Sequence, residues 1–146
     1  MSENELVITE IQPADTSTEL KLPMAEAACP AGFPSPAEDY MEERLDLNEH
    51  LIDNPAATFF VRVSGASMVD AGIHNGDILI VDRSLEPSEG EIVIAVLDGQ
   101  LAVKRLVKEK GEFYLFSEND DYENLKINPE SDFRIWGVAT NVIHRL

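Results

Sequence analysis

Ser67 and Lys104 are the residues of this chain whose types and settings could support nucleophilic chemistry. Ser67 comes shortly after Ser64-Gly65, a turn signal that ends a run of aromatic and β-branched residues typical of a strand. A loop at the end of a strand can present a nucleophile on a rigid scaffold, although a serine there is more often only a turn residue. A serine hydroxyl also needs a base that takes its proton.

Histidine is the usual base, but the three histidines have unfavourable settings. His50 lies in a polar helical stretch, His74 lies in a turn beside Asn75-Gly76, and His144 is close to the C-terminus. Each is best interpreted as a surface residue. A serine can instead pair with a lysine, provided that burial keeps the lysine uncharged.

Lys104 fits this second requirement. Residues 100–107 are predicted to form a strand, and strand side chains alternate between two faces, so Lys104 shares a face with Ala102 and Leu106. These apolar neighbours would keep water away from its amine. The alternative is that Lys104 extends to water at the edge of a sheet. The residues by themselves leave both interpretations open.

Four short motifs follow one another in an order that resembles the LexA/UmuD family of self-cleaving serine peptidases. They are Ser-Gly-Ala-Ser-Met at 64–68, Asn-Gly-Asp-Ile-Leu-Ile-Val-Asp at 75–82, Gly-Glu-Ile-Val-Ile-Ala at 90–95 and Asp-Gly-Gln-Leu-Ala-Val-Lys-Arg-Leu at 98–106. The segment Gly-Phe-Pro-Ser-Pro-Ala-Glu-Asp-Tyr at 32–40 resembles most the UmuD members, which are accessory subunits of error-prone translesion DNA polymerases. Each motif alone is weak, whereas the ordered set is specific and extends from Gly32 to the C-terminus.

The resemblance implies a role for each matching residue. Ser67 would be the nucleophile, Lys104 the general base, and the bond between Ala31 and Gly32 the one that is cut. The chain has Cys29 two residues before Ala31, so it departs from the Cys-Gly bond that is typical of UmuD itself. Cleavage would remove an N-terminal arm, residues 1–31, and leave a peptidase and dimerisation domain, residues 32–146.

The resemblance also implies partners. A RecA filament on single-stranded DNA would promote self-cleavage after DNA damage, as part of the SOS response. The shortened chain would then join a UmuC-like polymerase as a homodimer in translesion synthesis. LexA-type repressors carry a helix-turn-helix module before their cleavage site, and residues 1–31 are too few and too acidic for such a module.

Composition favours a protein that acts in DNA metabolism through protein partners. The formal net charge is −17, which argues against direct binding to nucleic acid. The one basic cluster (Lys104, Arg105, Lys108 and Lys110) is short and is best interpreted as a solvated face. No apolar run approaches the roughly 20 residues that span a bilayer, and the acidic N-terminus does not resemble a secretory signal. A soluble cytoplasmic protein is expected.

No cofactor is expected, because no His, Cys or acidic residues have the spacing of metal ligands and no glycine-rich phosphate loop is present. Cys29 is the only cysteine, so no intrachain disulfide can form. Asp70, Asp77 and Asp82 are interpreted as turn or surface carboxylates.

We expect a mainly β fold, namely a compact LexA/UmuD-like peptidase domain of twisted antiparallel sheets with a short N-terminal helix, preceded by a flexible arm. Within the arm, only Leu6 to Ile11 are predicted to form a strand. A capping box at Ser35-Pro36-Ala37-Glu38 predicts a helix that continues to about Arg44, and a second helical turn is predicted near Leu47 to Ile52.

From Thr58 onward the pattern is that of strands joined by turns. Asp98-Gly99 predicts a two-residue hairpin turn that places Lys104 opposite the preceding strand, and Lys110-Gly111 predicts another turn. Strands are expected at 58–63, 77–82, 91–97, 100–107, 112–117 and 132–144.

Two other functions remain open. A Ser-Lys peptidase that acts in trans, as the related signal peptidases do, would cut added peptides faster than its own arm. A non-catalytic, β-rich interaction module would use Ser67 only as a turn residue and Lys104 only as a structural one. In that case a Ser67→Ala variant would be processed like the wild type.

Overall fold

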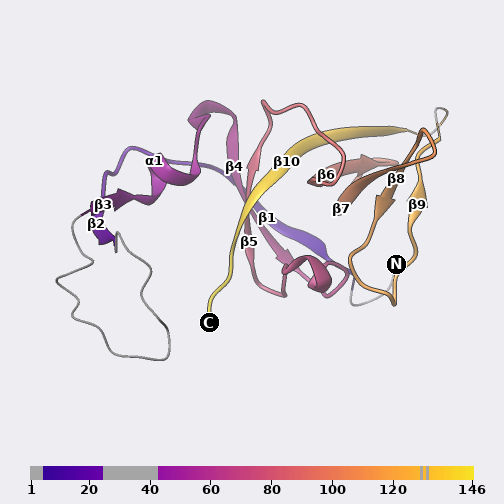
Figure 1. Ribbon diagram of the computed structural model, residues 1–146, viewed down its shortest axis with the longest axis horizontal. Coiled ribbons are helices and arrows are strands. Elements are labelled where there is room, and N and C mark those ends of the chain that lie inside the picture. The colour runs from indigo at the N-terminus through magenta and orange to yellow at the C-terminus, as the bar shows by residue number, and fades with distance from the viewer. Residues whose placement is uncertain (1–4, 25–42, 129, 131) are drawn as a thin grey trace. The chain divides into compact units, whose positions relative to one another are not determined.

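The computed structural model describes residues 5–24, 43–128, 130 and 132–146, and Figure 1 shows its elements. The described chain divides into two compact units, one made of residues 5–14 and 56–146 and the other of residues 15–55. Ser67 and Lys104 both belong to the first unit, so that unit holds the candidate chemistry.

The larger unit is one antiparallel sheet of eight strands in the order β1-β4-β5-β10-β6-β7-β8-β9 (Figure 1). The strands are β1 (Val7–Pro13), β4 (Thr58–Ser64), β5 (Ile78–Asp82), β6 (Ile92–Leu97), β7 (Gln100–Glu109), β8 (Glu112–Phe116), β9 (Leu125–Lys126) and β10 (Phe133–Ile143). β1 also contacts β7, so the sheet curls far enough to bring together two strands that are not neighbours in its order. The expected mainly β fold is confirmed, and every predicted strand is present with bounds that differ by at most two residues.

β6 lies inside the sheet and packs on both of its faces. Ile94 belongs to one buried cluster, whereas its neighbours Val93 and Ala95 belong to another. Because successive side chains of a strand point to opposite faces, each face of the sheet has its own core. The first cluster also contains Val63 and Met68, which precede and follow Ser67 in the chain. The loop that carries Ser67 is therefore anchored in the core at both ends.

Two tight turns set the register of the strand that carries Lys104. Asp98 and Gly99 have φ values of +50° and +79°, as a type I′ hairpin turn requires. The hairpin pairs β6 with β7 and places Lys104 opposite Val93, as the sequence predicted. The predicted turn at Lys110-Gly111 joins β7 to β8 in the same way, with φ values of +51° and +81°.

The smaller unit contains β2 (Lys21–Met24), β3 (Glu43–Asp46) and helix α1 (Leu47–Leu51), and the short 3-10 helix η2 (Pro55–Ala57) follows. β2 pairs with β3, so the expectation that the arm beyond its first strand lacks regular structure was wrong. The partner strand lies far along the sequence, which explains why local pattern did not reveal it.

Helix α1 confirms the predicted second helical turn. The Asp46 side chain caps it by accepting a hydrogen bond from the Asn48 backbone N–H at 3.0 Å. The helix predicted from the capping box lies mostly outside the described residues, and its predicted end at Arg44 was wrong because Arg44 belongs to β3. None of the helices in the described residues is long and apolar enough to cross a membrane.

Candidate active site

The loop after β4 brings Ser67 into the interior. β4 ends at Ser64, and Gly65 follows with a φ of +115°, which side chains with a Cβ rarely adopt. A Cβ at Gly65 would lie 2.3 Å from the backbone carbonyl oxygen of Glu5. Glycine is therefore required here for two reasons, the backbone conformation and the close approach of the N-terminal segment. The 3-10 helix η3 (Val69–Ala71) then leads away from the loop.

Ser67 itself is 1% exposed, and its only described partner is in that N-terminal segment. The backbone N–H of Leu6 donates a hydrogen bond of 2.9 Å to the Ser67 Oγ. Leu6 is 3% exposed and packs in the same core cluster as Val63 and Met68. The segment that meets the serine is therefore fixed by apolar packing as well as by the hydrogen bond.

Lys104 is 3% exposed, so the alternative in which it extends to water at a sheet edge is wrong. Its Nζ donates a hydrogen bond of 2.6 Å to Ser117 Oγ and lies 3.3 Å from a carboxylate oxygen of Glu5. The prediction that the basic cluster forms a solvated face is therefore wrong for Lys104. Arg105, the next residue, pairs with Glu118 instead.

Ser67 and Lys104 thus meet consecutive residues of one segment, Leu6 and Glu5. β1 makes this possible because it pairs with β4, whose end leads to Ser67, and also contacts β7, which carries Lys104. Within the described part of the chain, Ser67 Oγ and Lys104 Nζ share no direct hydrogen bond. Instead, Ser67 Oγ accepts a hydrogen bond from Leu6, and Lys104 Nζ donates one to Glu5.

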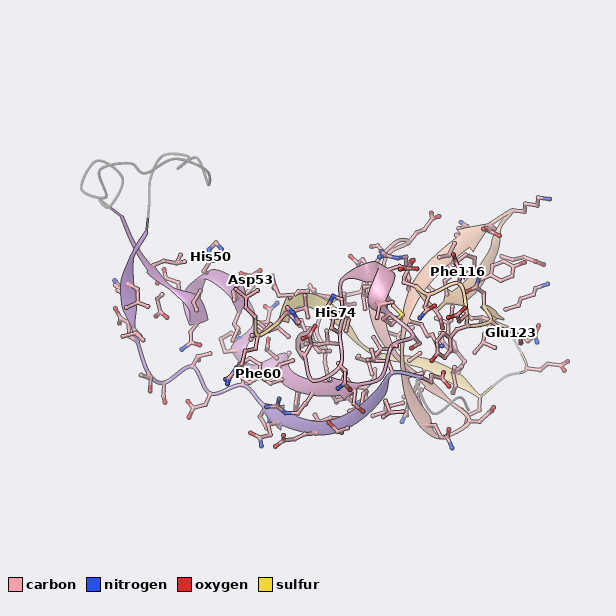
Figure 2. All side chains as sticks on the ribbon, turned by 90° about the horizontal axis from the view of Figure 1, so that it is seen from below. His50, Asp53, Phe60, His74, Phe116 and Glu123 are labelled. Atoms are coloured by element: carbon pink, nitrogen blue, oxygen red, sulfur yellow. The ribbon has the colours of Figure 1, made fainter. Side chains whose placement is uncertain are left out.

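The segment after β8 supports both sides of this site, and Phe116 and Glu123 mark its two ends in Figure 2. Ser117 holds the Lys104 amine. The backbone of Glu118 accepts a hydrogen bond from the Asp70 N–H at 2.8 Å and donates one to the Met68 sulfur at 3.3 Å. Asn119 then donates from its side-chain Nδ2 to the Ala66 carbonyl oxygen at 2.8 Å. Ala66 and Met68, the two residues that flank Ser67, therefore tie the nucleophile loop to this segment.

A cavity of about 550 Å³ lies beside Lys104. Its walls come from the start of β1, the β6–β7 hairpin and β9, and they include Leu6, Leu101 and Lys126. The Lys126 Nζ on β9 lies 2.9 Å from a carboxylate oxygen of Glu112 on the neighbouring strand β8. This hydrogen-bonded contact raises the pKa of Lys126 and lowers the pKa of Glu112 from their ordinary values. The cavity has room for a peptide segment next to the lysine, with a mixed apolar and charged lining.

Two of the three histidines lie together elsewhere in the larger unit. His74, labelled in Figure 2, has its ring centroid 5.0 Å from that of His144, and His144 Nδ1 lies 2.6 Å from a carboxylate oxygen of Asp77. Asp77 also accepts the His74 backbone N–H at 2.8 Å. Asp77 and Asp82 each accept a backbone N–H group of a turn, which agrees with their interpretation as turn carboxylates, and their burial excludes a surface position.

Ala31, Gly32 and Cys29 lie outside the described residues. Among the residues that are described, no group of three or more His, Cys, Asp or Glu side chains is arranged to hold a metal ion.

Comparison with known proteins agrees with this architecture. The model of the family described as "Peptidase S24-like" matches residues 23–140. The chain belongs to the peptidase S24-like family. It is 47% identical over 137 residues to Protein ImpA of Salmonella typhimurium, and the match covers 92% of each chain. It is also 46% identical to Protein SamA of Salmonella typhimurium strain LT2, with 96% of this chain and 94% of SamA covered.

A LexA repressor also matches this S24-like peptidase. The LexA repressor of Dechloromonas aromatica is 39% identical, and the match covers 86% of this chain and 62% of the repressor. The resemblance to the LexA/UmuD family that the motifs predicted is therefore confirmed.

Sequence reasoning missed four supporting residues of this S24-like site, namely Glu5, Leu6, Ser117 and Asn119. The predicted strand from Leu6 gave a partial signal, since a strand near the N-terminus must pair with something. The roles of Ser117 and Asn119 had no local signal, because they depend on how the chain after β8 returns to the nucleophile loop.

Proposed function

We propose that this S24-like peptidase cuts its own chain at the Ala31–Gly32 bond, with Ser67 as the nucleophile and Lys104 as the general base. The reaction is an acyl transfer followed by hydrolysis, and it needs no cofactor. It divides the chain into an arm, residues 1–31, and a shortened protein, residues 32–146.

Uncharged Lys104 takes the hydroxyl proton of Ser67, and Oγ forms a bond to the carbonyl carbon of Ala31. The bond from that carbon to the nitrogen of Gly32 breaks, and the proton passes from Lys104 to this nitrogen. Backbone N–H groups near Ala66 and Ser67 would stabilise the oxyanion. Water then attacks the ester, which releases the arm with a free carboxylate and restores the Ser67 hydroxyl.

The observation that carries the proposal is that Ser67 and Lys104, at 1% and 3% exposure, both meet one N-terminal dipeptide. The Lys104 amine is shielded from water and donates a hydrogen bond to Ser117, so it is held inside the site. Binding of an extended peptide segment at both side chains is the arrangement that a peptidase needs for its substrate. Glu5 and Leu6 are upstream of the proposed bond, so the cleavage segment would have to take their place.

In the cell, a RecA filament on single-stranded DNA would promote docking of the cleavage segment after DNA damage. The shortened chain would act in the cytoplasm as a homodimer with a UmuC-like polymerase during SOS mutagenesis. Membership in the S24-like family and the similarity to ImpA and SamA support this role. The net charge of −17 supports partners that are proteins rather than DNA.

Intact mass spectrometry after incubation at alkaline pH tests the proposal, with wild type, Ser67→Ala and Lys104→Ala in parallel. We expect only the wild type to lose residues 1–31 and to gain an N-terminus at Gly32. If all three chains stay whole even with a RecA filament, or all three are cut alike, the chain is a binding module instead. Faster cleavage of an added peptide than of the arm would indicate a peptidase that acts in trans.

A further inference from the structure

Ser117 is a buried polar residue that the acyl-transfer scheme does not use. It is 7% exposed, and its hydroxyl oxygen accepts the hydrogen bond of 2.6 Å from Lys104 Nζ. We propose that Ser117 is a positioning residue for the general base. The inference rests on the proposed function, because it concerns the lysine of the same site.

The chemistry of an amine base explains why such a residue is needed. An uncharged lysine has two N–H groups and one lone pair, and the lone pair must point at the Ser67 hydroxyl. The lysine side chain has four rotatable carbons, so burial by itself does not fix the direction of the lone pair. A hydrogen bond from one N–H to Ser117 restricts the rotation of the amine and leaves the lone pair available.

Ser117 is also tied to the nucleophile. The next residue, Glu118, binds the backbone of Asp70 and the sulfur of Met68. Asn119 binds the carbonyl of Ala66. Because Ala66 and Met68 flank Ser67, a shift of the nucleophile loop would move the Ser117 segment with it. The hydroxyl that holds the base therefore keeps a fixed position relative to the nucleophile.

A matched pair of variants distinguishes the effect of the Ser117 hydroxyl group from the effect of side-chain shape. Ser117→Thr keeps the hydroxyl, whereas Ser117→Val has nearly the same shape without it. We expect self-cleavage of the Val variant at alkaline pH to be slower by roughly tenfold to a hundredfold, as for a misplaced catalytic group. The Thr variant should cleave at close to the wild-type rate. Urea unfolding of both variants checks that the difference does not come from loss of the fold.

Equal rates for the Thr and Val variants would overturn the positioning role while leaving self-cleavage intact. If the Val variant does not fold, Ser117→Ala takes its place, because it removes the hydroxyl without adding volume. Wild type and Ser67→Ala run beside them. A wild type that never cuts itself would overturn the proposed function, and with it the base that Ser117 would position.

The N-terminal dipeptide carries a second and independent inference. We infer that Glu5 and Leu6 hold the site in an inactive state. The Leu6 N–H occupies a lone pair of the Ser67 Oγ, and the Glu5 carboxylate pairs with the protonated form of Lys104. A protonated lysine cannot take a proton from the serine. Both partners of the reaction are therefore engaged by a segment that is not the substrate.

The inhibitory segment is held by more than these two contacts. Leu6 is buried in the core, and β1 pairs with β4 from Val7, opposite Ser64, to Pro13, opposite Phe59. Gly65 allows the Glu5 backbone to approach the nucleophile loop closely. The cleavage segment would need to displace this strand end, which makes self-cleavage slow without a stimulus.

Removal of the Glu5 charge tests this inhibition, with Glu10→Gln as the matched control. Glu10 lies in β1, further along the same N-terminal segment, and pairs with Arg62 on the surface. We expect Glu5→Gln to raise the rate of unstimulated self-cleavage at neutral pH several-fold and Glu10→Gln to leave it unchanged. Asp98, Lys126 and Asp132 line the same cavity and are kept in every variant.

An unchanged or lower rate for Glu5→Gln would overturn the inhibition. A chain without residues 2–6 provides a second variant, and it should also cut itself faster than the wild type. If none of these chains cleaves at any pH, the failure lies with the proposed function rather than with the inhibitory segment alone. Slow cleavage by the wild type and equal cleavage by both variants would refute only the inhibition.

Discussion

Two clusters of chemically capable side chains lie in the same sheet, and they differ in setting more than in composition. The cluster of His74, Asp77 and His144 contains the residue types of a familiar base and its orienting carboxylate. The pair of Ser67 and Lys104 contains a less common base. In the first cluster the His144 side chain is 45% exposed and the rings contact one another. In the second, both side chains are buried against a peptide segment.

The difference teaches that residue type alone is a poor guide to a reactive site. The half-exposed His144 ring contacts the buried Asp77 carboxylate, so this contact can act as a structural clamp between the end of the chain after β10 and the turn before β5. Lys104 is buried beside Ser117 and a peptide segment, and a buried serine that touches a peptide backbone is placed where a substrate would lie. We therefore assign the chemistry to the Ser–Lys pair and a structural role to the His–Asp cluster.

The largest expected effect separates the two clusters directly. Lys104→Arg should lower the rate of self-cleavage by roughly a thousandfold or more, because arginine stays protonated and cannot serve as a base. His144→Ala should leave the rate within a few-fold of the wild type. Time courses of intact mass at alkaline pH measure both. Comparable losses in the two variants would mean that the histidine cluster takes part in the chemistry.

The pH dependence gives a second contrast. The rate of self-cleavage should rise from neutral to strongly alkaline pH, because a lysine can act as a base only in its uncharged form. The same rise is expected for His144→Ala, since that ring is not the base. A profile that is flat over this range would argue against a lysine base. A rise that disappears in the His144 variant would move the assignment to the other cluster.

A stability measurement sharpens the structural role of the histidine cluster. Asp77 is buried and accepts both the His74 backbone N–H and the His144 ring contact. Asp77→Ala removes the acceptor of the partly buried His74 N–H and the partner of His144, so the free energy of unfolding should fall by about 1–3 kcal/mol. Urea unfolding measures the change. His144→Ala should cost less, because its ring is largely solvated, and an equal cost would contradict this division.

The smallest effect concerns the exposed pair at the edge of the cavity, Glu112 and Lys126. The Lys126 contact lowers the pKa of Glu112 below its ordinary 4.5, so its contribution to stability is present above that value and is lost as pH falls through the lowered pKa. The same contact raises the pKa of Lys126 above 10.5, so that contribution is lost as pH rises through the raised value.

Glu112→Gln should therefore lower the urea midpoint slightly between about pH 5 and pH 10 and leave it unchanged at more acidic and more alkaline pH. Urea titrations at pH 3, 7 and 11 compare the variant with the wild type. Self-cleavage should not change, because neither residue touches Ser67 or Lys104. A gap that is equally large at pH 3 would show that the contact acts through something other than charge.

Local sequence patterns predicted seven of the described strands (β1, β4, β5, β6, β7, β8 and β10), the two hairpin turns and the two candidate residues of the Ser–Lys pair. Alternation and turn residues are local, so the hairpin at Asp98-Gly99 and the position of Lys104 opposite Val93 followed from neighbouring residues. The order of the four motifs indicated the family, and the family match confirms it.

The surroundings of the Ser–Lys pair depend on long-range contacts that local sequence patterns do not predict. The burial of Lys104, the approach of Glu5 and Leu6, and the return of Ser117 and Asn119 to the nucleophile loop all join segments that are far apart in the chain. Local sequence patterns do not predict these long-range contacts, because the contacts arise from the curl of the sheet. The same limit explains why the pairing of β2 with β3 was missed.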